Sequence, residues 1–318
     1  MAGFKQWFRK RLRKFLRSHG LEAKPRRGIR LPARRSPSPS RRDLAIVAIA
    51  QNEGQVLREW LEFHRLVGAE HVYLYDDGST DKTADIVRPF VDQGFATFVP
   101  WTRFTHDIGA QQTAYAHALS AYGSNWRWMA FIDLDEYLFP VAEESLVSTL
   151  KRYEDVSAIA IPWHMFGFCG HETRPFGLVI ENFTRRAQFP PSAEFEQLLK
   201  WKCIVDPLAV ERVDSAHLFF MENERRGAYT EDRVWVGKKR SEGWEGVRSD
   251  VFRLNHYYTQ SKEDFEARRA SGRWPSYAAR SPVHWERARH MAEMIESADQ
   301  TEDRLILRYL PELQRRLS

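Results

Sequence analysis

The sequence of 318 residues has little of what defines several common protein classes. Its two cysteines, Cys169 and Cys203, are too few for a disulfide framework and lack the paired spacing of a zinc site. No stretch approaches the roughly 18 apolar residues of a membrane-spanning helix, and the first residues lack the apolar core of a signal peptide. We therefore expect a globular protein of a reducing compartment, the cytoplasm.

Acidic residues are nearly missing from the first 42 positions. That segment holds 15 Lys or Arg against Glu22 alone, a net charge of +14, whereas the remaining residues sum to −9. The mildly acidic remainder argues against a nucleic-acid-binding core. A protein of a different class, which binds nucleic acid through its basic segment, would show a steeply salt-dependent affinity carried by residues 1–42.

The basic segment also carries a helical pattern. Residues 4–17 place six apolar side chains on one stripe, with Lys and Arg over most of the rest: Phe4, Trp7, Phe8, Leu12, Phe15 and Leu16. Such an amphipathic helix suits the headgroup region of an anionic membrane, at the inner face of the cytoplasmic membrane. The alternative is a helix that docks on its own domain or on a partner. Residues 24–42 are rich in Arg, Pro and Ser and predict a solvated linker.

From residue 43 onward, short apolar runs alternate with segments of helical periodicity. The run Leu44–Ala50 has strand length and little alternation, as expected for a buried parallel strand. We expect further strands at 71–75, 95–99, 128–133, 157–162 and 201–205 and before Asn255, and helices at 56–67, 82–93, 109–122, 261–270, 284–298 and 300–316. The order predicts an α/β fold, a mostly parallel twisted sheet flanked by helices, at 43–260, after a basic segment at 1–42 and before a helical extension at 261–318.

Polar side chains follow three of these strands. Gln51-Asn52-Glu53, Asp76-Asp77 and Asp133-Leu134-Asp135 each come where a predicted strand ends. In open α/β sheets, ligands bind beyond the carboxyl ends of the strands. We therefore expect the three clusters to converge on one edge of one sheet.

The pair Asp133 and Asp135 is the most informative of these clusters. Side chains two apart on an extended chain point the same way, so both carboxylates can face one hard cation while Leu134 turns toward the core. A divalent cation there can bridge the pair to a diphosphate and neutralise charge on the leaving group. Asp-X-Asp alone is often only a solvated strand end, and the two other polar strand ends make it more specific.

With these motifs the sequence resembles GT-A glycosyltransferases, especially the family 2-like group and glycosyltransferase family 92. The likeness rests on the motifs Ala50–Glu53, Tyr75–Asp81 and Phe131–Tyr137, and continues through Phe166-Gly167, Gly170-His171, Trp201–Val205 and Asn255–Tyr258. It covers about residues 44–270. It implies a GT-A fold and the transfer of a sugar from a nucleotide sugar, a UDP-sugar, to a hydroxyl on a glycan, glycolipid or polysaccharide. It also implies that the transfer inverts the anomeric centre and depends on Mn²⁺ or Mg²⁺ as cofactor.

The resemblance implies roles for residues of the donor site. Asp77 would accept a hydrogen bond from the uracil ring, with Asn52, Glu53 and Asp76 shaping the nucleotide pocket. Gln111 and Gln112 begin a helix where the family carries a donor-side polar residue, and we assign Gln112 to the donor. The alternative for these glutamines is the ordinary polarity of a helix start.

For the cation, the resemblance implies Asp135 as the principal ligand, Asp133 toward the ribose or the metal, and His256 as the residue that completes the shell. A histidine that is hydrogen-bonded among Tyr257 and Tyr258 is the alternative for His256. Lys202 either reaches the donor phosphates or merely begins a strand.

An inverting transfer also needs a base that takes the proton from the acceptor hydroxyl. Glu172, just after Gly170-His171, is our candidate, and His171 and His164 compete with it. An exposed loop glutamate is usually only solvated, which is the alternative for Glu172. We expect His217, next to an apolar run, to be structural.

Two other interpretations, one an enzyme and one a protein without activity, share the expected sheet. A nucleotidyltransferase usually opens with a glycine-rich phosphate loop after its first strand, and the residues Gln51-Asn52-Glu53-Gly54 at that place argue against it. A sugar-binding or scaffold protein could keep the fold without activity, but the retention of both Asp133 and Asp135 argues against that interpretation.

Overall fold

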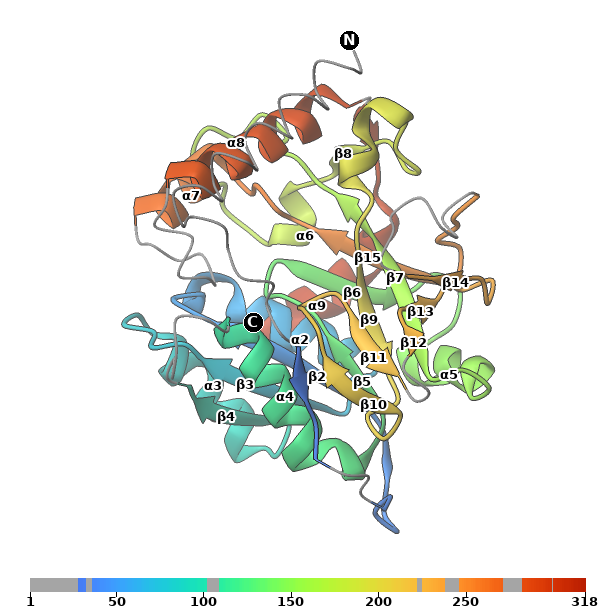
Figure 1. The fold of residues 1–318 in the computed structure, drawn as a ribbon. Coiled ribbons are helices and arrows are strands. Elements are labelled where there is room, and N and C mark those ends of the chain that lie inside the picture. Colours follow the sequence, from blue (N-terminus) through green and yellow to red (C-terminus); the bar gives the residue numbers. More distant parts are fainter. Residues whose placement is uncertain are drawn as a thin grey trace, which may run out of the picture.

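The structure is a computed structural model that describes residues 28–32, 36–101, 109–221, 225–237, 246–270, 282–298 and 300–318. The predicted amphipathic helix at 4–17 lies outside these ranges. A mixed sheet runs through the molecule between layers of helices (Figure 1). Its strands lie in the order β14 (Trp235–Val236), β13 (Ala228–Tyr229), β7 (Ala158–Met165), β9 (Trp201–Val205), β5 (Trp126–Phe131), β2 (Arg42–Ala50), β3 (His71–Asp76) and β4 (Ala96–Pro100).

Most neighbours in this sheet are parallel. Strands β5, β2, β3 and β4 all run the same way, and β9 is inserted antiparallel between β5 and β7. Strand β15 (Phe252–His256) pairs parallel with β7 and antiparallel with β6 (Glu136–Pro140). The α/β fold class predicted from the sequence is confirmed, although β6 was not expected.

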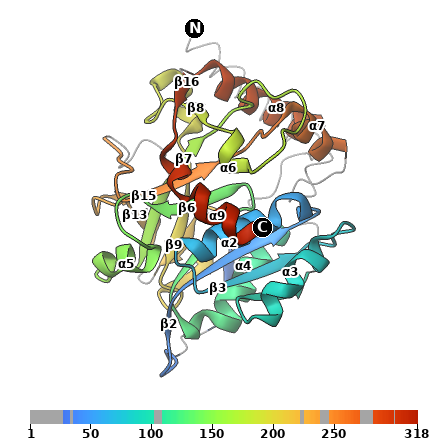
Figure 2. The same cartoon turned by 180° about the vertical axis from the view of Figure 1, so that it is seen from behind.

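The two faces of β2 bury different side chains, which explains its unbroken apolar run. Leu44 and Ile46 join a core with Trp60 of α2 (Gly54–Leu66), whereas Val47 joins a second core with Tyr115 of α4 (Ala110–Tyr122). Helix α3 (Thr83–Asp92) packs beside α2. Figure 1 shows α4 in front of the sheet, and Figure 2, from behind, shows α2 with α9 (Leu310–Leu317) across the other face.

A small second sheet extends the α4 side. It contains β1 (Ile29–Arg30), β10 (Val210–Val213), β11 (Phe219–Met221) and β12 (Arg225–Arg226) in that order. Ile29 pairs with Val213, and both Ile29 and Leu31 pack against the second core. Part of the segment predicted as a solvated linker is therefore built into the fold, because its few apolar side chains find cover there.

The C-terminal part adds helices and a two-stranded ribbon. Its elements are α7 (Lys262–Ala270), α8 (Pro282–Ser297), β16 (Gln300–Glu302), which pairs with the earlier β8 (Arg185–Ala187), and a 3-10 turn at Leu305–Tyr309. Short elements earlier in the chain are α5 (Leu146–Leu150), α6 (Val179–Asn182) and 3-10 turns at Gly123–Asn125, Lys151–Tyr153 and Ala193–Leu198. The continuous helix predicted at 300–316 is wrong. Residues 300–302 form β16 and pair with β8, because Asp303 is held by ion pairs with Arg186 and Arg253.

The residues after 260 share the main core. Ile295 of α8 and Leu313 of α9 are fully buried in the same core as Trp60, and α9 lies along α2. Within the described ranges, none of the helices has the length and apolarity that crossing a membrane requires.

Candidate active site

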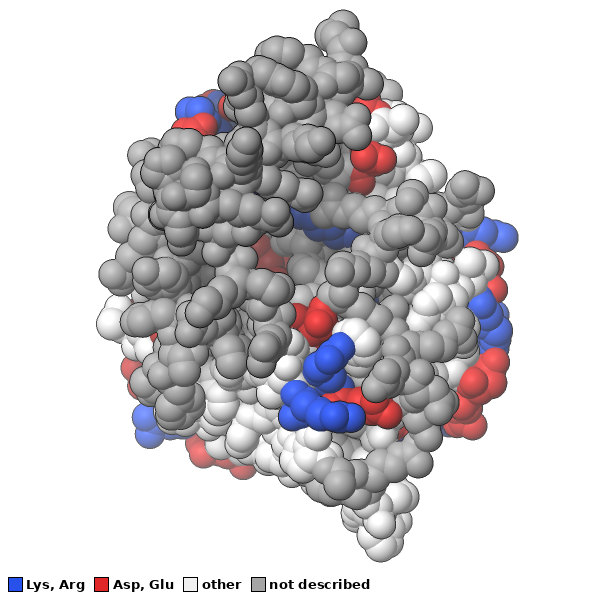
Figure 3. Space-filling model, in the orientation of Figure 1, with Lys and Arg blue, Asp and Glu red and all other residues white. Residues whose placement is uncertain are grey.

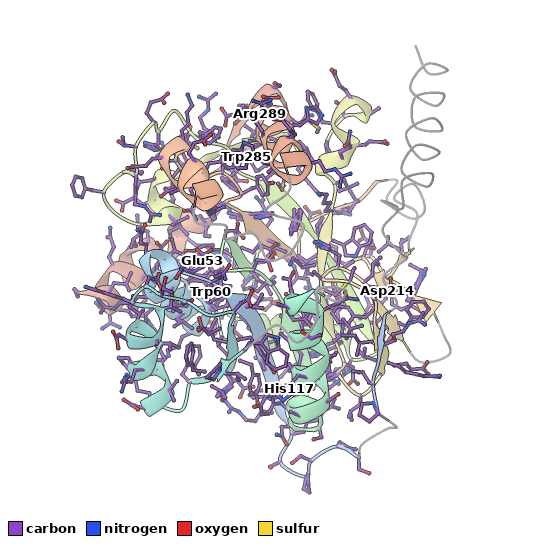
Figure 4. The ribbon with its side chains drawn as sticks, turned by 60° about the vertical axis from the view of Figure 1, so that its left-hand side comes forward. Glu53, Trp60, His117, Asp214, Trp285 and Arg289 are labelled. Atoms are coloured by element: carbon purple, nitrogen blue, oxygen red, sulfur yellow. The ribbon has the colours of Figure 1, made fainter. Side chains whose placement is uncertain are left out.

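The three polar strand ends meet at one cavity of about 260 Å³, as predicted. Its described lining includes Gln51, Glu53, Asp77, Gln111, Asp133, Asp135, His256 and Arg268. On the face drawn in Figure 3, acidic and basic side chains border a hollow near the centre. Figure 4 shows Glu53 where α2 begins, directly after the first of the three strand ends.

Asn52 joins the loops that follow β2 and β3. Its φ of 57° is a left-handed conformation, which asparagine tolerates better than most residues. The side-chain Oδ1 accepts hydrogen bonds from the backbone N–H of Thr80 (2.6 Å) and Asp81 (3.2 Å). Asp76 accepts from the N–H of Ser79. Asn52 and Asp76 therefore shape this edge without lining the cavity, whereas Glu53 and Asp77 line it.

The segment Asp133–Glu136 is a tight turn rather than the extended chain we expected. Strand β5 ends at Phe131, and the N–H of Glu136 donates to the carbonyl of Asp133 (3.1 Å). The N–H of Asp133 donates back to Glu136 Oε2 (3.0 Å). Leu134 is buried in the core, as predicted. The turn sends the two aspartates toward different neighbours, although both line the cavity.

His256 reaches Asp135 because β15 pairs with β6. In that antiparallel register His256 lies opposite Glu136, and the N–H of Tyr257 donates to the carbonyl of Asp135 (2.8 Å). His256 Nε2 lies 3.4 Å from Asp135 Oδ1. Burial raises the pKa of Asp135, but His256 and Arg268 outweigh it and lower that pKa to about 2.

Among the described residues, Asp135, Glu136 and His256 form the group whose side-chain ligand atoms all lie within 4.8 Å of one another. A carboxylate and an imidazole are suitable ligands for Mn²⁺, and Mg²⁺ accepts the carboxylate. Glu136 Oε1 and His256 Nδ1 are buried without hydrogen-bond partners and lie 4.0 Å apart. A metal-bound histidine commonly turns its other nitrogen to a carboxylate, and this arrangement fits that pattern.

Asp133 is bound by the protein instead of joining that group. Lys202 Nζ donates to its Oδ2 (2.8 Å), and Gln111 donates to its Oδ1. Cys203 of β9 pairs with Phe131, which brings Lys202 level with the residues after β5. Burial lowers the pKa of Lys202, but the charges of Asp133 and Glu136 outweigh burial and raise it. Lys202 is 1% exposed and does not line the cavity, so it neutralises the carboxylates from beneath.

Three residues assigned from the sequence are placed elsewhere. Gln112 is buried against β10, where its Nε2 donates to the carbonyl of Asp214 (2.7 Å), and its neighbour Gln111 lines the cavity in its place. The Glu172 side chain is 74% exposed and forms an ion pair with Lys262. His171 Nε2 bonds the carbonyl of Asn182 (3.2 Å). Neither Glu172 nor His171 lines the cavity, so the structure does not bring them together with the other predicted site residues.

His164, the third candidate base, is buried with its Nε2 on Ser249 Oγ and does not line the cavity. Other residues that do line it carried weak signals or none in the sequence. His217 lines the cavity, although its Nδ1 donates to the carbonyl of Trp201 as a structural histidine would, and burial lowers its pKa to about 3. Trp163 packs with its ring centre 4.3 Å from that of His256. Arg268 comes from α7, whose periodicity predicted a helix but not its place beside Asp135.

The sequence matches a family over most of its length. Residues 46–277 match the model of glycosyltransferase family 92. A family 92 protein of Ricinus communis is 24% identical to this chain, and the match covers 76% of this chain and 44% of that protein. A family 92 protein of Arabidopsis thaliana is 22% identical, and the match covers 77% of this chain and 44% of that protein. Galactan beta-1,4-galactosyltransferase GALS2 of Arabidopsis thaliana is 29% identical over 120 residues, 34% of this chain and 22% of that protein. The chain thus spans less than half the length of these curated relatives.

Solved structures are similar at a lower level. S. aureus TarS 1-349 is 12% identical and covers 80% of this chain and 70% of its own, with a TM-score of 0.36. The mannosyltransferase PcManGT from Pyrobaculum calidifontis is 20% identical, and the match covers 47% of this chain and 42% of that chain with a TM-score of 0.29. The family match spans all three polar strand ends together with Lys202 and His256, and this chain therefore belongs to glycosyltransferase family 92.

Proposed function

We propose that this chain transfers a sugar from a UDP-sugar to a hydroxyl of a glycan, glycolipid or polysaccharide, with a divalent cation and with inversion. The observation that supports this most is the convergence of three polar strand ends on one cavity beside the pair of Asp135 and His256. Family membership supports the transferase class. The galactosyltransferase among the relatives supports a hexose as the transferred group and a glycan as its acceptor.

In this proposal the nucleoside lies between the ends of β2 and β3. Glu53 and Asp77 line the cavity there, and Asp77 is 8% exposed, so its carboxylate can accept from a base while sheltered from water. Gln51 fixes this wall, because its Nε2 donates to the carbonyl of Asp77 (2.8 Å). Asn52 and Asp76 hold the two loops in place.

Asp135 and His256 would hold the cation, Mn²⁺ or Mg²⁺, with the Glu136 carboxylate facing the other nitrogen of His256. When bound, the cation would supply positive charge to the departing diphosphate. Asp133 lines the cavity while Lys202 and Gln111 engage its two oxygens, so we assign it to the ribose side and not to the cation. The acceptor hydroxyl attacks the anomeric carbon as the diphosphate leaves and gives its proton to a base. Neither Glu172 nor His171 lines the cavity, so we place no proton transfer on them.

The experiment compares Asp135→Asn with Asp85→Asn. Turnover of UDP-sugars with and without MnCl₂, and Mn²⁺ affinity by electron paramagnetic resonance, are measured for both. We expect Asp135→Asn to lose more than about 100-fold in Mn²⁺-dependent turnover and to bind Mn²⁺ weakly. Asp85 lies on α3 with its side chain 77% exposed, so its variant should match the wild type. Metal-dependent turnover at the wild-type rate in Asp135→Asn would refute the cation site.

We further propose that residues 4–17 bind an anionic membrane surface, at the inner face of the cytoplasmic membrane. Their aromatic stripe and surrounding Lys and Arg side chains support this. The test uses Trp7→Ser with Phe8→Ser in the full chain, since Ile29 and Leu31 belong to the fold and deleting residues 1–42 would disturb it. The double variant should lose co-sedimentation with phosphatidylserine vesicles, and unchanged binding would exclude this segment as the anchor.

A further inference from the structure

Arg268 presents a guanidinium to the cavity. Among the described residues that line it, Arg268 is the sole Lys or Arg, beside the four acids Glu53, Asp77, Asp133 and Asp135. Lys202 lies beneath the floor, and its ammonium is engaged by Asp133. Of the described lining, Arg268 is therefore the residue that offers a permanent positive charge to a diphosphate in this cavity.

The contacts of Arg268 are those of a guanidinium that can exchange partners. Its Nη1 donates to the carbonyl of Tyr258 (2.7 Å), which anchors one side of the group. The same nitrogen lies 3.4 Å from Asp135 Oδ2, at the long limit of a hydrogen bond. Arg268 thus neutralises Asp135 through a long hydrogen bond, which it can give up without losing the Tyr258 anchor.

Helix α7 presents Arg268 from a fixed position. Ser261 Oγ accepts from the N–H of Asp264 and caps the helix start. Asp264 pairs with Arg174 (2.6 Å), and Phe265 packs with its ring centre 4.8 Å from that of Trp285 of α8, the helix that carries both Trp285 and Arg289 in Figure 4. The backbone of α7 is therefore held while the guanidinium faces the cavity.

We propose that Arg268 binds the diphosphate of the donor and of the nucleotide product, and that it leaves Asp135 when a divalent cation takes that carboxylate. This inference rests on the proposed function. Arg268 and the cation compete for Asp135 when no nucleotide is present, since both are positive and both seek the same oxygens. Once a diphosphate is bound they act together, because the planar guanidinium can donate two parallel hydrogen bonds to phosphate oxygens.

The competition gives Arg268→Gln two effects of opposite sign. Without nucleotide, the variant should bind Mn²⁺ several-fold more tightly than the wild type, because a competing cation has been removed. With saturating Mn²⁺, it should bind UDP about 10- to 100-fold more weakly, because a charge-assisted hydrogen bond to phosphate is lost. A variant that merely disturbs the site would weaken both.

Electron paramagnetic resonance measures the first affinity, and titration calorimetry with UDP measures the second. Arg268→Lys should keep the competition with Mn²⁺ but recover only part of the UDP affinity, since a lysine lacks the fork. Arg289→Gln is the matched control, because the Arg289 side chain is 55% exposed on α8 and does not line the cavity, so both affinities should stay near wild type. If Arg268→Gln left both affinities unchanged, or shifted the Mn²⁺ and UDP affinities in the same direction, the proposal would be overturned. Undiminished Mn²⁺ binding by Asp135→Asn would instead count against the proposed function.

Discussion

Lys202 provides a direct test of how the acidic site is held together. Its side chain is 1% exposed, and its Nζ lies 2.8 Å from Asp133 Oδ2 and 3.7 Å from Glu136 Oε1. Lys202→Met keeps most of the side-chain volume and removes the charge. Lys262→Met is the matched control, because Lys262 forms an ion pair of 2.6 Å with Glu172 whose side chains are 53% and 74% exposed. The two lysine side chains differ strongly in burial, whereas their ion-pair distances of 2.8 Å and 2.6 Å are similar.

The expected losses follow from that difference. Removing one partner of a buried ion pair costs about 3–5 kcal/mol. We expect about 3 kcal/mol for Lys202→Met, the lower end of that range, because Asp133 is one third exposed and keeps its bond from Gln111. Burial raises the pKa of Glu136, so this carboxyl can also take up a proton instead of remaining an unpaired charge. The exposed pair of Lys262 is worth about 0–1 kcal/mol.

Thermal unfolding followed by circular dichroism separates the two cases. At roughly 2 °C per kcal/mol, the low end of the range because the chain is longer than about 250 residues, Lys202→Met should lower Tm by about 6 °C and Lys262→Met by at most about 2 °C. Adding Glu136→Gln to Lys202→Met should restore part of the loss, since one of the two carboxylates that Lys202 faces is gone. Equal losses in the two lysine variants would show that Lys202 is not the counter-charge of this site.

Three further changes test other parts of the structure. Burial raises the pKa of Glu59 to about 7 from 4.5, so its contribution to stability is complete below pH 4.5 and falls by about 3 kcal/mol as the pH rises to 7. Urea unfolding of wild type against Glu59→Gln should show this change, and a pH-independent difference would contradict it. Glu172→Gln should keep turnover within about twofold, because its carboxylate faces solvent and Lys262, and a loss above about 100-fold would restore it as a candidate base. Asp303→Asn should cost about 3 kcal/mol in urea unfolding, since Asp303 is 8% exposed and pairs with Arg186 and Arg253, and a loss below about 1 kcal/mol would contradict this.

The sequence predicted the elements around the cavity because local signals carry them. Leu44–Ala50 is buried on both faces, so its run is unbroken, and Ser261, which caps α7, begins the helix predicted at 261–270. Parallel strands then bring their carboxyl ends together by topology alone. For this reason the positions of Glu53, Asp77, Asp133 and Asp135 could be predicted without any knowledge of side-chain contacts.

What the sequence could not predict depends on pairing between distant segments. Glu136–Pro140 has the apolar pattern of a continued strand, and only its ladder with β15 shows that the chain has turned. The segment at 300–302 has no local feature that favours a strand over a helix, and its partner β8 lies far earlier in the chain. Gln111 and Gln112 are neighbours of the same type, and the packing of α4 on β10 decides which of them faces the cavity.

The same reasoning explains why an Asp-X-Asp spacing locates a site but does not assign its ligands. An extended chain would give both carboxylates one neighbour, whereas the turn gives each a different strand. Asp133 meets Lys202 from β9, and Asp135 meets His256 from β15. Because β9 is inserted antiparallel beside β5, it brings a lysine to Asp133, whereas β15 brings an imidazole to Asp135. Our proposal therefore assigns the cation to Asp135, the carboxylate that faces the imidazole.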